Sequence, residues 1–213
     1  MNLPTKITFS RIIATIILII ALFVLSVIPN LSTPLLGNSR INLIFLVVFV
    51  FFVIASYTDH LDGKLARKNN QVTDLGKFLD PVADKLLVSS MLIFLVAPSL
   101  FARYAPDQVA SFSVWCVIIM VARDTVVDAM RFIAAQKNVV IAANIFGKMK
   151  TVLQMVAIGV VLLNGFPFNY FDASWPVGLH ISDFLVYLAT LVSFLSGVIY
   201  VYQNRHVLKE EKK

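Results

Sequence analysis

The chain has 213 residues, of which 59% are hydrophobic and only 14% are charged, and its mean hydropathy is +0.84. One soluble core of this length could not bury so much apolar surface, so the composition excludes an ordinary soluble domain and indicates an integral membrane protein. The net charge of +6 could suggest nucleic-acid binding, but the basic residues stand at the ends of apolar runs, where they face anionic headgroups or charged substrates. We therefore expect membrane lipids, and no nucleic acid, as partners.

Six apolar stretches are predicted to be transmembrane helices, because crossing the hydrocarbon core takes about 20 helical residues. In chain order they cover residues 7–28, 41–57, 85–101, 109–135, 152–163 and 184–202, and the fifth is expected to begin near Lys148. Residues 2–6 are predicted as a short interfacial helix with Pro4 in its first turn. The sequence shows no internal repeat and no second domain, so residues 1–213 are interpreted as a single all-α membrane domain.

The distribution of basic residues predicts the orientation in the membrane. Among lysines and arginines, the first connection between the predicted helices holds only Arg40 and the third holds only Arg103. The fifth connection holds none. Most other basic residues fall on the opposite side, so the positive-inside rule puts both termini on the cytoplasmic side of the membrane. We expect this membrane to be a bacterial-type cell membrane. The segment between the second and third helices faces the cytoplasm as well, where a water-soluble substrate could reach it.

That segment contains four aspartates, Asp59, Asp62, Asp80 and Asp84. If the second helix continues through its polar end, Asp59 and Asp62 share one helical face, and Asp80 and Asp84 do the same at the start of the third helix. Carboxylates that converge repel one another unless cations lie among them, and ligands made only of oxygen suit Mg²⁺ or Mn²⁺ rather than zinc. The sequence therefore predicts a site for one or two such ions. The alternative is a set of solvated loop charges at the membrane surface.

Small residues and one arginine accompany the aspartates. Gly63, Ala66 and Gly76 remove side-chain bulk, so that a ring or a phosphate could approach the backbone closely. Arg67 offers a planar donor fork for a phosphate or a carboxylate. An arginine here is equally typical of the cytoplasmic edge of a membrane helix.

The pattern Asp59-x-x-Asp62-Gly63-x-x-Ala66-Arg67, an eight-residue spacer, and Gly76-x-x-x-Asp80-x-x-x-Asp84 resembles the complete signature of the CDP-alcohol phosphatidyltransferases. The resemblance extends over most of the chain, and residues 2–11 and 147–154 are similar to members that use glycerol 3-phosphate as the acceptor. It implies that an alcohol displaces CMP from CDP-diacylglycerol with the help of Mg²⁺ or Mn²⁺. It also implies a homodimer.

The same resemblance implies roles for individual residues. Asp59, Asp62 and Asp80 would hold metal ions, and Asp84 would share that role while acting as the general base for the attacking hydroxyl. The residues expected to bind the cytidine diphosphate group are Asp62, Gly63, Ala66, Arg67 and Gly76.

Glycerol 3-phosphate carries close to two negative charges, so its site should be basic. The main candidates for binding its phosphate are Arg123 and Arg131, eight residues apart on the fourth helix, with Lys148 and Lys150 at the start of the fifth. Lys137 and Arg11 are weaker candidates. The alternative is that part of this group is a structural ion-pair network, in which Asp128 pairs with Arg131, three residues away, or with the neighbours of Asp124.

Two other functions remain open from the sequence. Relatives with the same signature use other acceptors, and a phosphate-binding group is also compatible with inositol phosphate or phosphatidylglycerol. A small metal-ion or proton-coupled transporter would also carry acidic residues in its helices. Such a protein usually has them near the middle of the bilayer, whereas here they cluster at one interface, which favours the transferase.

Overall fold

The structure, a computed structural model, describes residues 3–28, 35–36, 41–68, 74–96, 110–137, 139, 145–172, 174–176 and 178–208. Side chains at 3–4, 26, 60–68, 74–75, 77–78 and 208 lie outside this description. The elements are α1 (Leu3–Val27), α2 (Leu43–Lys68), α3 (Asp74–Val96), α5 (Val114–Gln136), α6 (Ile145–Leu162), η2 (Phe168–Tyr170), α7 (Ile181–Asn204) and η3 (Arg205–Leu208). The expected all-helical class is confirmed for these ranges, which contain no β-strand.

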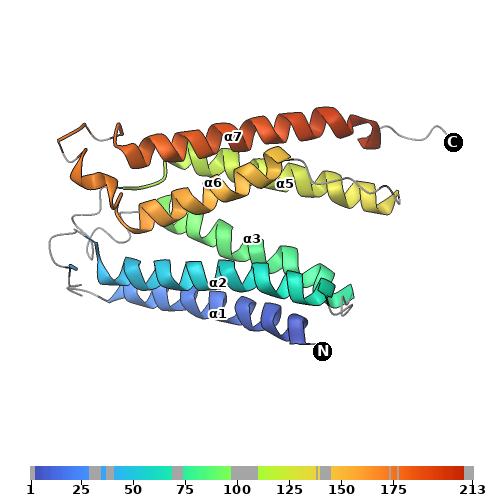
Figure 1. Cartoon of the computed structure of the whole chain (residues 1–213), viewed down its shortest axis with the longest axis horizontal. Coiled ribbons are helices and arrows are strands. Elements are labelled where there is room, and N and C mark those ends of the chain that lie inside the picture. The colour runs from blue at the N-terminus through green and yellow to red at the C-terminus, as the bar shows by residue number, and fades with distance from the viewer. Residues whose placement is uncertain are drawn as a thin grey trace. The chain divides into compact units, whose positions relative to one another are not determined.

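The helices form two compact units, which are described separately. In the first unit α1 packs against both α2 and α3, shown in blue, cyan and green (Figure 1). The face of α1 in these contacts carries a buried polar stripe, Thr5, Thr8, Arg11 and Thr15, at the three- and four-residue spacing of one helical face. A polar stripe inside an apolar helix needs polar partners, because an unsatisfied buried donor costs about 1–3 kcal/mol.

The second unit contains α5, α7 and most of α6, and the packing of α5 against α7 is its most extensive contact between helices (Figure 1). Small and polar side chains of α7 are buried here, among them Ala189, Ser193, Ser196 and Gly197. Small residues let two membrane helices approach closely. The close approach of the two helices brings the side chains of α5 within reach of the polar groups on α7.

Side chains cap the starts of two helices, and positive backbone φ angles follow the end of a third. At the start of α2, the Asn42 Oδ1 accepts a hydrogen bond of 2.9 Å from the backbone N–H of Ile44. At the start of α7, carboxylates of Asp183 and Asp172 accept from the N–H groups of residues 180 and 181, at 3.1 and 2.7 Å. Residues 164 and 165, with φ of 54° and 78°, follow the end of α6 in the left-handed region that terminates many helices.

The observed helix ends differ from the predicted ones where polar residues continue an apolar helix. The predicted interfacial helix is not separate, because α1 runs without a break from Leu3 to Val27. The second helix continues through the acidic stretch to Lys68, and α3 begins at Asp74 rather than at Lys85. The sequence estimate followed hydropathy, whereas a helix continues wherever its backbone hydrogen bonds can be made, polar side chains included.

Three described helical segments are long and apolar enough to cross a membrane. They are Thr5–Leu25, Ile145–Leu162 and Ile181–Val207, and the apolar part of α2, Leu43–Asp59, is shorter. Large apolar side chains also cover the exposed surfaces of α1 and α7, with Phe23 and Phe184 both more than 60% exposed. In water such surfaces would aggregate, so the fold is consistent with an integral membrane protein.

Candidate active site

The four signature aspartates occupy two helices of the first unit. Asp59 and Asp62 both lie within α2, three residues apart, and Asp80 and Asp84 both lie within α3, four residues apart. Each pair therefore shares a face of its helix, as the spacing predicted. The side chains of Asp59, Asp80 and Asp84 are partly buried, whereas that of Asp62 lies outside the description.

The polar stripe of α1 contacts an aspartate on each of the two helices. The Thr8 hydroxyl donates a hydrogen bond of 2.9 Å to Asp80 Oδ1, and the Arg11 guanidinium forms an ion pair with Asp59. Thr8 and Arg11 are three residues apart on one face of α1. One helix face thus orients an aspartate from α2 and an aspartate from α3.

The donor chemistry of this region fits a hard divalent ion. Carboxylates are the oxygen ligands that Mg²⁺ and Mn²⁺ prefer, and no sulfur or imidazole ligand is needed. Among the described side chains, no three acidic, histidine or cysteine groups gather closely enough to form a metal site by themselves. Asp62, a fourth carboxylate of the same chemistry, lies outside this count because its side chain is not described.

The other signature residues lie along the same two helices. Counting from Asp59 on α2, Asp62, Gly63 and Ala66 follow at three, four and seven residues, and Arg67 follows at eight, which keeps these positions near one face. Gly76 lies one turn before Asp80 on α3 and is partly buried. The side chains of Ala66 and Arg67 lie outside the described set, so their predicted contacts with cytidine diphosphate stay predictions.

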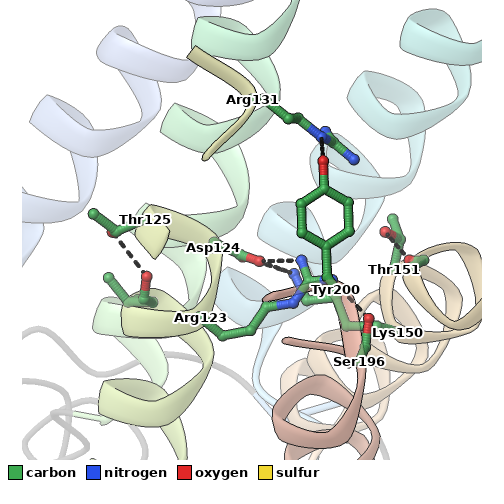
Figure 2. A network of polar contacts seen from close by, with 10 residues as sticks. Arg123, Asp124, Thr125, Arg131, Lys150, Thr151, Ser196 and Tyr200 are labelled. Atoms are coloured by element: carbon green, nitrogen blue, oxygen red, sulfur yellow. Dashed lines mark hydrogen bonds and ion pairs between the residues drawn. The ribbon is translucent and has the colours of Figure 1, made fainter. Parts of the chain in front are cut away.

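The second unit contains a cluster of charges around Asp124. Lys150 Nζ donates to both carboxylate oxygens of Asp124, at 2.7 and 2.6 Å, and Arg123 Nη1 donates to Oδ1 at 3.0 Å (Figure 2). Lys150 is only 5% exposed, which makes this a partly desolvated cluster rather than a surface pair. In these described contacts, two cations share the carboxylate of Asp124.

Side chains of α7 complete the surroundings of the α5 arginines. Arg123 Nη2 donates a hydrogen bond of 2.7 Å to the Ser196 hydroxyl. Two turns further along α5, Arg131 Nε donates to the Tyr200 hydroxyl at 3.3 Å, and its guanidinium lies 5.6 Å from the centre of the Tyr200 ring (Figure 2). Both arginines are therefore oriented by the same helix.

The remaining candidate cations have other described surroundings. Lys148 is exposed on α6, although it lies only two residues before the buried Lys150. Lys137 caps the end of α5 and donates a hydrogen bond of 2.9 Å to the Val207 carbonyl oxygen. Arg11 belongs to the first unit, where its ion pair is with Asp59.

The profile of the CDP-alcohol phosphatidyltransferase family matches residues 1–199, which include both aspartate pairs and the Asp124 cluster. The chain belongs to this family. This confirms the family that the spacing of the aspartates predicted.

Curated phosphatidyltransferases of the family are similar over nearly their whole length. A Bacillus subtilis protein is 37% identical over 210 residues, covering 98% of this chain and 97% of its own length. A Mycoplasma pneumoniae protein is 34% identical, covering 100% of this chain and 91% of itself, and a Rickettsia bellii protein is 31% identical, covering 93% of each. All three are named CDP-diacylglycerol–glycerol-3-phosphate 3-phosphatidyltransferase.

The sequence of this phosphatidyltransferase did not predict several residues that contact the candidate site residues. Thr8 was not among the predicted site residues, although its spacing from Thr5 and Arg11 was a usable signal. Ser196 and Tyr200, four residues apart on α7, gave no comparable signal, because serine and tyrosine are common in membrane helices. Only the packing of α7 on α5 shows that they contact arginines.

Proposed function

We propose that this protein transfers the phosphatidyl group of CDP-diacylglycerol to glycerol 3-phosphate, giving phosphatidylglycerophosphate and CMP. The observation that carries the proposal is the complete aspartate pattern on α2 and α3, in a chain whose full-length relatives are named for this reaction. The Asp124 cluster adds two largely buried cations, Arg123 and Lys150, which suit an acceptor with a phosphate group. Acceptors without a phosphate would gain little from it.

The donor is bound by the signature residues. Asp62, Gly63, Ala66, Arg67 and Gly76 hold the cytidine diphosphate group, with the small residues leaving room for it beside the backbone. Asp59, Asp62, Asp80 and Asp84 are the residues that would hold metal ions, Mg²⁺ or Mn²⁺ and two in number. Such ions supply charge neutralisation to the diphosphate and to the departing CMP. The contacts of Asp59 with Arg11 and of Asp80 with Thr8 orient these carboxylates before substrate binds.

Asp84 serves as the general base. The glycerol 3-phosphate hydroxyl oxygen forms a bond to the phosphorus that carries the diacylglycerol, and the bond from that phosphorus to the CMP oxygen breaks. CMP leaves with the electron pair, and the hydroxyl proton passes to Asp84. An aspartate is a weak base, so its main contributions are orientation of the hydroxyl and acceptance of the proton late in the step.

The acceptor phosphate is bound by cations of the second unit. Arg123 and Lys150 are the first candidates, because both are largely buried and both contact the same carboxylate, that of Asp124. Arg131 and Lys148 are further candidates, and Lys137 and Arg11 are weaker ones. An arginine presents paired donors to phosphate oxygens, and a lysine supplies a compact charge.

The same proposal includes the arrangement in the membrane. The sequence distribution of lysine and arginine supports six transmembrane spans in a cell membrane, with both termini and the signature aspartates on the cytoplasmic side. We also propose a homodimer, as is common in this family.

The test is a transfer assay with the purified full-length protein in detergent. CDP-diacylglycerol, glycerol 3-phosphate and Mg²⁺ or Mn²⁺ should give CMP and phosphatidylglycerophosphate, and a chelator should stop the reaction. Absence of CMP release with every divalent ion would contradict the proposal. Inositol phosphate and phosphatidylglycerol should be offered in competition, because a lipid product built on either one would reassign the acceptor.

A further inference from the structure

Arg123 is the residue of the Asp124 cluster with the most closely defined surroundings. Its guanidinium donates to Asp124 on one side and to Ser196 on the other, through Nη1 and Nη2. Its aliphatic stem passes along α7, where Arg123 and Gly197 line an apolar cavity of about 620 Å³ together with Ile118 and Phe194. Both the stem and the charged end therefore have fixed neighbours.

The stem depends on the absence of a side chain at Gly197. A Cβ atom built at this position would lie 2.7 Å from Arg123 Cγ, with Cβ and Cδ of the same arginine at 3.7 and 3.8 Å. A separation of 2.7 Å is shorter than real Cβ contacts allow, so the arginine would have to move. Because Cγ is close to the root of the side chain, such a shift would change the direction of the whole guanidinium.

The charged end depends on the residue immediately before Gly197. Ser196 is 2% exposed, and its hydroxyl accepts the 2.7 Å hydrogen bond from Arg123 Nη2. A buried hydrogen bond to a charged donor is among the stronger side-chain contacts. Two consecutive residues of α7 thus determine the path of the stem and the orientation of the guanidinium.

We propose that Gly197 and Ser196 are positioning residues that hold Arg123 in the orientation required to bind the phosphate of the acceptor. This inference rests on the proposed function, because it deepens the acceptor site named there. Neither residue touches the substrate. Their effect on the reaction passes through Arg123, so it should appear in the binding of the phosphate-bearing acceptor and not in the binding of the nucleotide-bearing donor.

The decisive variant is Gly197→Ala, measured by steady-state kinetics with each substrate varied in turn. We expect the KM for glycerol 3-phosphate to rise about tenfold or more, the range for loss of a charged hydrogen bond, and the KM for CDP-diacylglycerol to stay within about twofold. Ser196→Ala should raise the same KM by a smaller factor, and Ser196→Thr, which keeps the hydroxyl, should restore it.

Gly147→Ala is the matched control, because Gly147 faces the same arginine from α6. A Cβ there would lie 3.9 Å from Arg123 Nη2, an ordinary contact distance, so we expect the KM for glycerol 3-phosphate to change by less than about twofold. Alanine is a better helix former than glycine, so neither glycine variant should fail through loss of helix propensity.

A second measurement does not depend on turnover. Inorganic phosphate should raise the melting temperature of the wild-type protein and of Gly147→Ala, and the concentration needed should be at least about tenfold higher for Gly197→Ala. If the wild type released no CMP, the proposed function would fail, and this phosphate titration would still decide the role of Gly197. An unchanged phosphate requirement, or equal rises in both KM values of Gly197→Ala, would overturn the inference.

Discussion

The two charged groups of this protein differ in which sign of charge predominates in their described contacts. In the first unit, α1 orients two carboxylates: Asp59 forms an ion pair with Arg11, and Asp80 accepts a hydrogen bond from Thr8, which carries no charge. In the second unit, the carboxylate of Asp124 accepts from two cations, Arg123 and Lys150. Two carboxylates with one cation suit a bound cation, whereas two cations on one carboxylate suit a bound anion.

Among the substitutions that test this comparison, Asp84→Asn should have the largest effect on turnover. An asparagine keeps the size of the side chain but cannot accept the hydroxyl proton, so turnover should fall by about 10²–10⁴-fold. The variant should still insert into the membrane and bind the nucleotide, which equilibrium binding of CDP-diacylglycerol would measure. Turnover close to the wild-type rate would remove Asp84 as the base.

Asp124→Asn tests whether the charged cluster of the second unit is stabilised by the carboxylate that its cations share. The substitution removes the carboxylate charge that pairs with the buried Lys150, and loss of one partner from a buried ion pair costs about 3–5 kcal/mol. Because the Asp124 side chain is 27% exposed, we expect a loss near the lower end, about 3 kcal/mol.

Thermal unfolding in detergent would measure this loss as a lower melting temperature. Thr125→Ser, at the next position on α5, is a suitable control because its hydroxyl faces the carbonyl of Val121 on its own helix. A melting temperature of Asp124→Asn equal to that of this control would contradict a stabilising role for Asp124.

Thr8→Val tests the first group with a smaller expected effect. Valine has nearly the same shape as threonine but cannot donate to Asp80, and a hydrogen bond to a charged group contributes about 1.5–3 kcal/mol. If half of this free energy is expressed in the reaction, kcat should fall by roughly threefold to tenfold. Thr8→Ser keeps the hydroxyl and should retain most of the rate; equal rates for the valine and serine variants would show that this hydrogen bond does not affect turnover.

The sequence predicted the aspartate pairs better than it predicted their surroundings. Spacing alone placed Asp59 with Asp62 and Asp80 with Asp84, because helical periodicity is a local property. The beginning of α3 was missed because the prediction followed hydropathy and the first turns of this helix are polar.

The contacts between helices could not be read from periodicity. Nothing local to α1 specifies that Thr8 faces α3, and nothing local to α7 specifies that Gly197 faces Arg123. A glycine in an apolar helix indicates close packing in general, without naming its neighbour. The alternative of a structural ion-pair network made Asp128 the pairing residue and did not anticipate the contacts of Asp124 with Arg123 and Lys150.

The central claim is that the second unit binds the phosphate of the acceptor, and Arg123→Gln tests it most directly. Glutamine can still reach toward Ser196 by hydrogen bonding but carries no charge. Steady-state kinetics with both substrates varied should show a KM for glycerol 3-phosphate raised by about tenfold or more, with the KM for CDP-diacylglycerol changed by less than about twofold. An unchanged KM for glycerol 3-phosphate, or a rise confined to CDP-diacylglycerol, would contradict the account.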